Sequence, residues 1–149
     1  MSISELSVKL LRKGAVLPRR ATAGSAGYDL CACLEEDLLL PQGGIVSVPT
    51  GVAIALPDPG HVALVFGRSG LGIKHGVAPA NGVGVIDSDY RGEILVGLKN
   101  SGPADVWLHP GDRIAQLLVM PVETPVLRQV EELDETGRGA GGFGSTGRL

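Results

Sequence analysis

The sequence predicts a single all-β domain built from short strands. Its 149 residues are the length of one domain. They include 23 glycines and 10 prolines but only 3% aromatic residues, a composition typical of tight turns between short strands. The apolar segments are brief, each is bounded by Gly, Pro, Asn or Asp, and no helical period is sustained. This regular alternation of short apolar segments and turn residues indicates a β-sandwich or β-barrel.

Each expected strand is an apolar, β-prone segment that ends at a turn residue. In chain order these segments are residues 8–11, 27–34, 37–40, 45–49, 51–56, 61–66, 83–86, 94–100, 105–108, 113–121 and 126–130. One short helix is expected over residues 69–75, with Ser69 as its N-cap, because a serine hydroxyl can accept a hydrogen bond from the first turn. The pattern indicates no second domain and no repeat.

Charge, hydropathy and cysteine spacing limit the possible partners. A net charge of -3 and a pI near 5.5 argue against a general nucleic-acid-binding surface. The N-terminus lacks the apolar core of a signal peptide, and no run reaches the roughly 18–20 apolar residues of a membrane span. Cys31 and Cys33 lie too close along one strand to form a bridge without strain, which favours a reducing compartment. We therefore expect a soluble cytoplasmic protein without a nucleic-acid or membrane partner.

The segment 81–94, NGVGVIDSDYRGEI, carries more chemistry than a turn requires. Residues 83–86 and 94–98 are expected to pair as a β-hairpin with a wide polar tip. Asp87 is either a turn carboxylate that bonds nearby backbone or a general base for an attacking water. Asp87 and Asp89 together are also candidate metal ligands.

Three further positions have both a structural and a functional interpretation. Residues 67–72, GRSGLG, form either a plain helix cap or an anion site in which Arg68, the Ser69 hydroxyl and backbone N–H groups converge on a phosphate. The Gln116 amide lies within an apolar strand, so it either bonds backbone in the core or reaches a ligand. Asp29 either caps local N–H groups or holds a hydrated Mg²⁺ ion.

The C-terminal residues 137–148 are rich in glycine and have no apolar periodicity. They are either a disordered tail or a mobile anion-binding arm. In the second interpretation Arg138 supplies charge, Ser145 and Thr146 supply hydroxyl donors, and Phe143 stacks on a base.

Several other motifs are excluded. Residues 139–144 match the G-x-G-x-x-G fingerprint of dinucleotide-binding proteins, but no strand and helix flank them so close to the C-terminus. The sequence has no Walker A motif and no nucleophile elbow. His61, His75 and His109 are too scattered to suggest a zinc site from their spacing.

Five stretches share their order, spacing and residue types with the motifs of one enzyme family. They are residues 26–30 (AGYDL), 67–71 (GRSGL), 81–94, 111–116 (GDRIAQ) and 138–147 (RGAGGFGSTG). Together they resemble the five motifs of the trimeric dUTP diphosphatases, or dUTPases, over nearly the whole chain. One departure is Gly72, where many relatives carry Ala.

The resemblance implies a jelly-roll-like β fold and a homotrimer with three sites between its subunits. It also implies Mg²⁺-dependent hydrolysis of dUTP to dUMP and pyrophosphate, which limits uracil in DNA and supplies dUMP for dTMP synthesis. The related dCTP deaminases share this fold, so a deaminase or a bifunctional enzyme is an alternative. A non-catalytic nucleotide-sensing module is another.

On the base side of the nucleotide, the resemblance implies that backbone groups of Asn81, Gly84 and Ile86 bind the uracil edge. Tyr90 would pack on the deoxyribose, where a 2′-hydroxyl does not fit. Asp87 would orient and deprotonate the water that attacks the α-phosphorus.

On the phosphate side, the resemblance implies that four residues hold the triphosphate: Arg68, Ser69, Gly70 and Gln116. Asp29 would bind Mg²⁺ through water. Residues 1–133 would form the core, and residues 134–149 an arm that closes the site of a neighbouring subunit. The implied arm contacts are Phe143 over the base and Arg138, Ser145 and Thr146 at the γ-phosphate, with Gly144 as a further substrate-binding residue.

Overall fold

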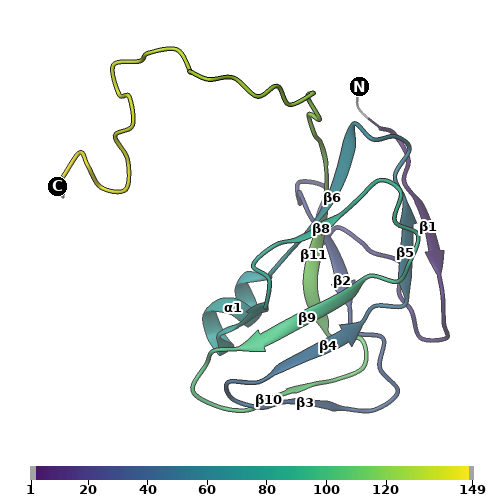
Figure 1. Ribbon diagram of the computed structural model, residues 1–149. Coiled ribbons are helices and arrows are strands. Elements are labelled where there is room, and N and C mark those ends of the chain that lie inside the picture. Colours follow the sequence, from purple (N-terminus) through teal and green to yellow (C-terminus); the bar gives the residue numbers. More distant parts are fainter. Residues whose placement is uncertain (1–2, 148–149) are drawn as a thin grey trace.

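The computed structural model describes residues 3–147 and confirms the all-β expectation (Figure 1). Eleven strands and one short helix are assigned among these residues. The strands are β1 (Ser7–Leu10), β2 (Tyr28–Cys31), β3 (Leu38–Leu40), β4 (Ile45–Pro49), β5 (Val52–Ala55), β6 (His61–Phe66), β7 (Val77–Pro79), β8 (Gly84–Ile86), β9 (Leu95–Asn100), β10 (Val106–Leu108) and β11 (Arg113–Pro121). The helix is α1 (Ser69–His75).

The strands form antiparallel sheets that pack around one core. A four-stranded sheet has the order β2-β11-β6-β8 and a three-stranded sheet has the order β4-β9-β7. Two smaller sheets pair β1 with β5 and β10 with β3. In Figure 1, β4 and β9 cross the direction of β11, as expected for two packed β-layers.

The core lies between the two larger sheets. Leu30 and Leu117 of the four-stranded sheet and Val48, Val96 and Leu98 of the three-stranded sheet are all buried. In β9 the buried residues alternate with more exposed ones, because successive side chains of a strand point to opposite faces. Burying each such side chain contributes about 1.5–3 kcal/mol. This apolar contact holds the sheets together and fixes the strand ends that carry polar residues.

The helix has the expected bounds but a different cap. Arg68, not Ser69, is the N-cap residue, with extended backbone and no side-chain cap hydrogen bond. The expected Ser69 cap was therefore wrong, because Ser69 is already the first helical residue. The helix ends at Gly76, which has a φ of 67° and donates its N–H to the Gly72 carbonyl. Within residues 3–147, no helix has the length and hydropathy to cross a membrane.

The expected hairpin of residues 83–86 and 94–98 was also wrong. Strand β8 pairs with β6, whereas β9 pairs with β4 and β7. The polar loop 87–94 therefore passes from one sheet to the other. Turn residues determine where the chain reverses, but burial in the core determines which strand becomes the partner.

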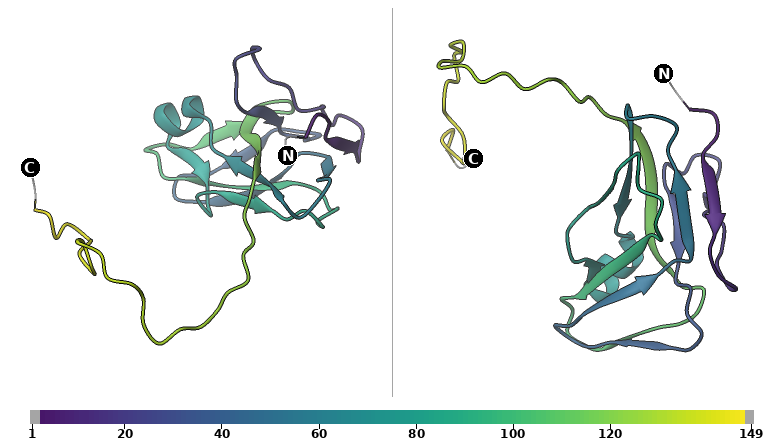
Figure 2. Two further views of the ribbon diagram at one scale, coloured as in Figure 1. Left: turned by 90° about the horizontal axis from the view of Figure 1, so that it is seen from above. Right: turned by 45° about the vertical axis from the view of Figure 1, so that its right-hand side comes forward.

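The chain leaves the core after β11. Residues 126–130 were expected to form a strand, but no strand is assigned to them and Val126 and Leu127 are almost fully exposed. A β-prone segment needs a partner strand to satisfy its backbone, and the described chain provides none here. Conversely, the short β7 was not expected, and it forms because β9 offers its edge. Figure 2 shows the tail clear of the core in both views.

Candidate active site

Three of the expected site residues meet where β2, β11 and β6 lie side by side. Gln116 of β11 is opposite Asp29 of β2 and opposite Phe66, the last residue of β6. Arg68 follows β6 by two residues, so the sheet brings its side chain to the same place. We call Asp29, Arg68, Gln116 and the nearby Arg113 the Asp29 cluster.

The carboxylate of Asp29 binds two arginines. The Nε of Arg68 donates to Oδ1 at 2.9 Å, and Nη1 of Arg113 donates to Oδ2 at 3.4 Å. The Asp29 side chain is only 17% exposed, so these charge-assisted bonds compensate for most of its lost hydration. Because Asp29 binds Arg68 through Nε, the terminal guanidinium nitrogens of Arg68 are available to an anion.

Gln116 of the Asp29 cluster connects it to Ser69 and Gly70 at the start of the helix. The Gln116 Nε2 donates to the Gly67 carbonyl at 2.9 Å, which ties the loop before α1 to β11. Ser69 and Gly70 are exposed residues of the first helical turn, whose N–H groups have no partner inside a helix. The cluster therefore presents cationic and neutral donors on one surface, a combination suited to an anion.

Arg113 was not expected in this site. Arg113 is opposite Cys31, which comes two residues after Asp29, so its side chain reaches the Asp29 carboxylate. An irregularity between Arg113 and Ala115 shifts the strand pairing at this point. In the sequence, the feature that pointed to Arg113 was a charged residue at the start of an otherwise apolar strand. Burial raises the pKa of the neighbouring Cys31 thiol, and the Asp29 charge adds to this effect. Cys31 therefore stays a neutral thiol near neutral pH and is a poor nucleophile.

A second group of expected residues lines a cavity of about 420 Å³. Its walls include Asn81, Gly84, Ile86, Asp87 and Tyr90, and we call it the loop pocket. Strand β8 is the last strand of its sheet, so one side of its backbone has no partner strand in the described chain. Such an edge offers N–H and C=O groups to a planar ligand.

Asp87 and Tyr90 lie at the rim of the loop pocket. The Asp87 carboxylate is exposed and makes no hydrogen bond to another residue of the described chain, so it is open to a ligand or water. The backbone N–H of Tyr90 donates to the Asp87 carbonyl at 3.2 Å, and the Tyr90 hydroxyl donates to the Glu93 carbonyl at 2.8 Å. Residues 3–147 contain no group of three His, Cys, Asp or Glu side chains that would hold a metal alone.

Asp87 and the Asp29 cluster lie at opposite ends of β6. Ile86 is opposite Ala63, which places Asp87 near Val62, whereas Arg68 lies beyond the other end of the strand. Six residue steps of extended chain lead from Val62 to Arg68, a span of about 20 Å at about 3.3 Å per residue. The loop pocket extends back along the strand, because Val65 and the opposite Gly84 both line it. Within one chain, it is the Asp87 carboxylate that is remote from the Asp29 cluster.

The expected arm residues are remote from the Asp29 cluster and from the loop pocket. Within the described chain, the hydrogen bonds of residues 136–147 join members of that segment, such as Arg138 Nε to the Gly141 carbonyl at 2.6 Å. Phe143 is fully exposed and has a φ of 52°, unusual for a residue with a side chain. Gly144, Ser145 and Thr146 are likewise exposed.

A larger cavity of about 850 Å³ lies elsewhere, against the N-terminal segment and β11. Its walls include Leu6, Leu17, Tyr28 and Val119, and Arg20 lies over the Tyr28 ring at 5.8 Å from the centroid. It holds none of the predicted site residues, so size alone does not locate the chemistry.

Comparison with known proteins decides the family. The dUTPase family model matches residues 13–147, which include all five motifs. The chain belongs to the dUTPase family. This confirms the resemblance and identifies the chain as a hydrolase of the dUTPase type.

Individual relatives agree with this assignment. The chain is 56% identical over 135 residues to a deoxyuridine 5′-triphosphate nucleotidohydrolase from Desulfitobacterium hafniense, covering 91% of this chain and 89% of that protein. The Staphylococcus bacteriophage 80alpha dUTPase with dUPNHPP superposes with a TM-score of 0.89 at 31% identity, covering 98% of this chain and 100% of that chain. The jelly-roll-like fold of these dUTPases is thus confirmed for this chain.

A further structural relative concerns a metal. It is a mutant dUTPase from phage phi11 of S. aureus, described as revealing the coordination of a structural Mg(II) ion. It superposes with a TM-score of 0.78 at 29% identity, covering 87% of this chain and 98% of that chain.

Proposed function

We propose that this dUTPase hydrolyses dUTP to dUMP and pyrophosphate in sites assembled between copies of the chain. The observation that carries the proposal is the placement of Asp87 and the Asp29 cluster at opposite ends of β6. Asp87 is about 20 Å along β6 from the donors proposed for the phosphates, so one chain does not bring both to the same α-phosphorus. Two copies that place one chain's pocket beside the other's cluster form a complete site.

The loop pocket is the proposed binding site for deoxyuridine. Uracil has alternating donors and acceptors along one edge, and the unpaired side of β8 provides complementary backbone groups near Asn81, Gly84 and Ile86. The Tyr90 ring at the rim packs on the deoxyribose. A close ring contact leaves no space for a 2′-hydroxyl, which distinguishes dUTP from UTP.

The Asp29 cluster is the proposed triphosphate site. Asp29 fixes the Arg68 guanidinium through Nε, so the terminal nitrogens of Arg68 can bind phosphate oxygens without reorganising. Ser69, Gly70 and Gln116 add neutral donors beside it. Local donors of this kind explain how a chain with a net charge of -3 binds a polyanion.

Asp87 is the proposed general base. Its exposed carboxylate accepts a proton from a water molecule as the water oxygen bonds to the α-phosphorus. The bond between the α-phosphorus and the oxygen that bridges to the β-phosphate breaks, and pyrophosphate leaves with that oxygen. Phosphoryl transfer depends mainly on positioning and charge stabilisation, so no covalent protein intermediate is needed.

The donor set suits Mg²⁺ together with the substrate. Asp29 is the only carboxylate of its cluster, and Mg²⁺ is usually held by one or two carboxylates plus substrate phosphates and water. We therefore assign Asp29 to a metal-bound water, as the family resemblance implies. When bound, Mg²⁺ would neutralise charge on the phosphates.

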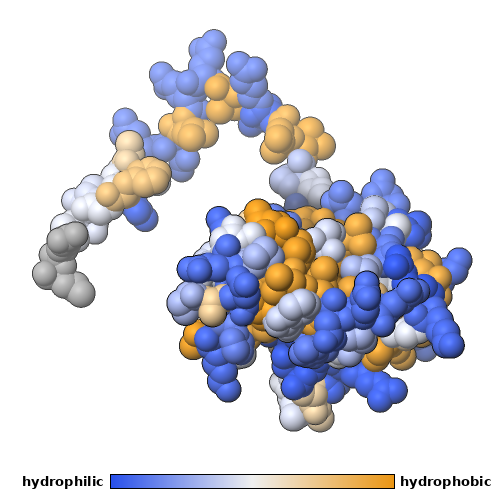
Figure 3. Space-filling model, turned by 90° about the horizontal axis from the view of Figure 1, so that it is seen from below, coloured by the Kyte–Doolittle hydropathy of each residue, from blue (hydrophilic) through white to orange (hydrophobic). Residues whose placement is uncertain are grey.

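A homotrimer is the proposed assembly, with the pocket, the cluster and the arm of each site coming from different copies. Residues 1–133 form the proposed core and residues 134–149 the arm, of which 148–149 lie outside the described residues. Figure 3 shows hydrophobic residues exposed along the tail as well as on the core. Phe143 would cover the base, while Arg138, Gly144, Ser145 and Thr146 would bind the γ-phosphate.

The proposed setting is the cytoplasm, where the reaction limits uracil in DNA and supplies dUMP for dTMP synthesis. Both cysteines, Cys31 and Cys33, are free thiols, as suits a reducing compartment. The substrate is the only partner proposed besides further copies of the chain.

A single experiment tests this function. Purified protein is incubated with Mg²⁺ and with dUTP, UTP, dTTP or dCTP, and released pyrophosphate and ammonia are measured. We expect pyrophosphate from dUTP at a rate far above that from the other three, with sedimentation at the mass of a trimer. Ammonia from dCTP would indicate a deaminase, and dUTP binding without pyrophosphate would indicate a sensing module.

A further inference from the structure

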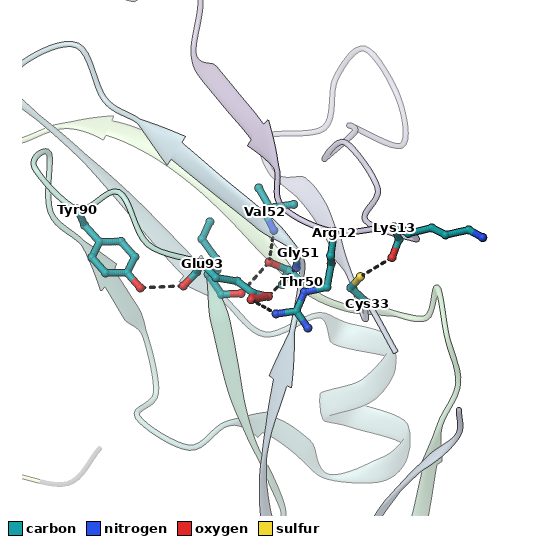
Figure 4. A network of polar contacts seen from close by, with 9 residues as sticks. Arg12, Lys13, Cys33, Thr50, Gly51, Val52, Tyr90 and Glu93 are labelled. Carbon is teal, nitrogen blue, oxygen red and sulfur yellow. Dashed lines mark hydrogen bonds and ion pairs between the residues drawn. The ribbon is translucent and has the colours of Figure 1, made fainter. Parts of the chain in front are cut away.

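Glu93 links Tyr90 to the N-terminal segment of the chain (Figure 4). The Glu93 carbonyl accepts the Tyr90 hydroxyl bond at 2.8 Å. The Glu93 carboxylate accepts a hydrogen bond from the Gly51 N–H at 2.9 Å through Oε2, and its Oε1 pairs with Nη2 of Arg12. Through its backbone and its side chain, Glu93 thus connects Tyr90 to Arg12, which lies 81 positions before Glu93 in the chain.

The backbone around Glu93 is attached to the same region. The Thr50 hydroxyl donates to the Ile94 carbonyl at 2.7 Å, and the Ile94 N–H donates to the Val52 carbonyl at 2.8 Å. Gly51 has a φ of 67°, and a Cβ there would lie 2.6 Å from the Ala15 Cβ. This glycine allows the turn to approach closely and to aim its N–H at the carboxylate.

The Glu93 charge requires its arginine partner. Its side chain is 15% exposed, so most of the carboxylate hydration is lost, while the Arg12 side chain is 49% exposed. Removing the guanidinium leaves a poorly solvated carboxylate, which gains hydration by moving toward water. Such a movement displaces the peptide that holds the Tyr90 hydroxyl.

The position of the Tyr90 ring depends on the backbone of residues 92 and 93. A Cβ on Gly92 would lie 2.6 Å from the Tyr90 Cζ, so the ring rests against the chain just before Glu93. The ring is therefore held at two points, by contact with residue 92 and by the hydroxyl bond to residue 93. A shift of this short segment moves the ring relative to the loop pocket.

We infer that Arg12 and Glu93 are positioning residues that fix the Tyr90 ring and thereby set the discrimination between dUTP and UTP. The inference rests on the proposed function, in which Tyr90 packs on the deoxyribose. Arg12 lies immediately before residues 13–147 that match the family model, so the motifs do not include it. Its effect reaches the substrate only through Glu93 and Tyr90.

The test compares kcat and KM for dUTP and UTP in Arg12→Ala, Arg12→Lys, Tyr90→Phe and the double variant Arg12→Ala/Tyr90→Phe. Asp37→Ala is the control, because it removes another exposed ion pair, the 2.8 Å contact with His109, without touching this network. The readout is the ratio of kcat/KM for dUTP to kcat/KM for UTP. A general loss of stability lowers both terms together, so this ratio separates positioning from folding.

We expect Arg12→Ala and Tyr90→Phe each to lower the ratio by about threefold to tenfold, the usual effect of one neutral hydrogen bond. The double variant should show no further loss, because both changes break one connection. Arg12→Lys should restore most of the ratio, and Asp37→Ala should leave it unchanged.

Two results overturn the inference while leaving the proposed function intact. One is a wild-type ratio in Arg12→Ala when Tyr90→Phe has lowered it. The other is an additive loss in the double variant. If Tyr90→Ala itself keeps the wild-type ratio, the sugar role of Tyr90 in the proposed function is wrong and the inference fails with it.

Discussion

The Nε of Arg68 donates a 2.9 Å hydrogen bond to Oδ1 of Asp29, which couples the carboxylate proposed for the metal to the guanidinium proposed for the phosphates. Asp29 comes from β2 and Arg68 from the loop after β6, and β11 lies between these strands in the sheet. A substitution of Asp29 therefore acts on two functions at once.

For Asp29→Asn we expect a higher Mg²⁺ concentration for half-maximal activity and a KM for dUTP raised by roughly tenfold. Saturating Mg²⁺ should not restore the KM fully, because Asn lacks the charge that orients Arg68. Steady-state kinetics across a Mg²⁺ titration measure both effects. Asp105→Asn, a carboxylate that accepts from the Gln42 N–H, is a control outside the cluster. Full recovery at high Mg²⁺ would restrict Asp29 to the metal.

Replacing Asp87 by Asn should abolish most turnover while leaving the fold and nucleotide binding intact. The amide cannot take the proton of the attacking water, and loss of a general base typically reduces the rate by about 10²–10⁴-fold. Single-turnover kinetics and calorimetric binding of a non-hydrolysable dUTP analogue separate the two effects. A kcat near that of the wild type would remove Asp87 from this role.

Sugar selectivity should weaken in Tyr90→Ala. Without the ring, space opens for a 2′-hydroxyl, whereas backbone contacts to uracil are insensitive to the ribose. UTP hydrolysis should therefore rise relative to dUTP hydrolysis, as measured by pyrophosphate release from each nucleotide. Val126→Ala, an exposed residue outside this pocket, is a suitable control. If the two nucleotides keep their wild-type ratio, selectivity resides elsewhere.

A chain that ends at Thr136 should fold, assemble and melt like the full chain but hydrolyse dUTP poorly. The described arm residues after Thr136 make no hydrogen bond to the core, so their loss removes little stabilising contact. Their contribution lies in closing the site and excluding water. Calorimetry, sedimentation and activity assays test the three expectations.

Mixing provides a sharper test of shared sites. Arm-less chains mixed with full-length Asp87→Asn chains should regain part of the activity, because some mixed trimers combine an intact Asp87 with an intact arm. Full activity of the truncated chain alone would show that the tail is dispensable.

The pair formed by His109 and Asp37 should respond to pH. Its 2.8 Å contact raises the pKa of His109 above 6.5, chiefly through the hydrogen bond to Asp37 and also through the opposite charge. A raised pKa in the folded state means that the pair stabilises the fold below pH 6.5 and loses this effect as the pH rises through the folded pKa. Asp37→Asn should lower the His109 pKa in an NMR titration. The difference in Tm between Asp37→Asn and wild type should be larger at about pH 6 than at about pH 9.

Local structure was largely readable from the sequence. The strands over residues 45–49, 61–66 and 113–121 and the helix over residues 69–75 have the expected bounds, because each contains a clear apolar pattern between turn residues. The residues of the five motifs, and hence the family, are likewise a property of the linear chain.

Partner choice was decided only by the tertiary structure. Residues 83–86 and 94–98 were expected to pair with each other, but the core buries Ile86 and Val96 in different sheets, and the loop between them became a connection rather than a hairpin tip. Residues 126–130 have the composition of a strand but no edge to join in the described chain. Strand pairing depends on which faces can be buried together, and a single segment does not contain that information.

The same reason explains the site. The sequence determined which side chains carry a charge, a hydroxyl or an aromatic ring. The fold determined that Arg113 contacts Asp29 across a strand pair and that Arg12 contacts Glu93, 81 positions along the chain. It also determined that Arg68 and Asp87 lie at opposite ends of β6. Contacts between distant residues form because sheet register and burial bring them together, so only the tertiary structure could decide them.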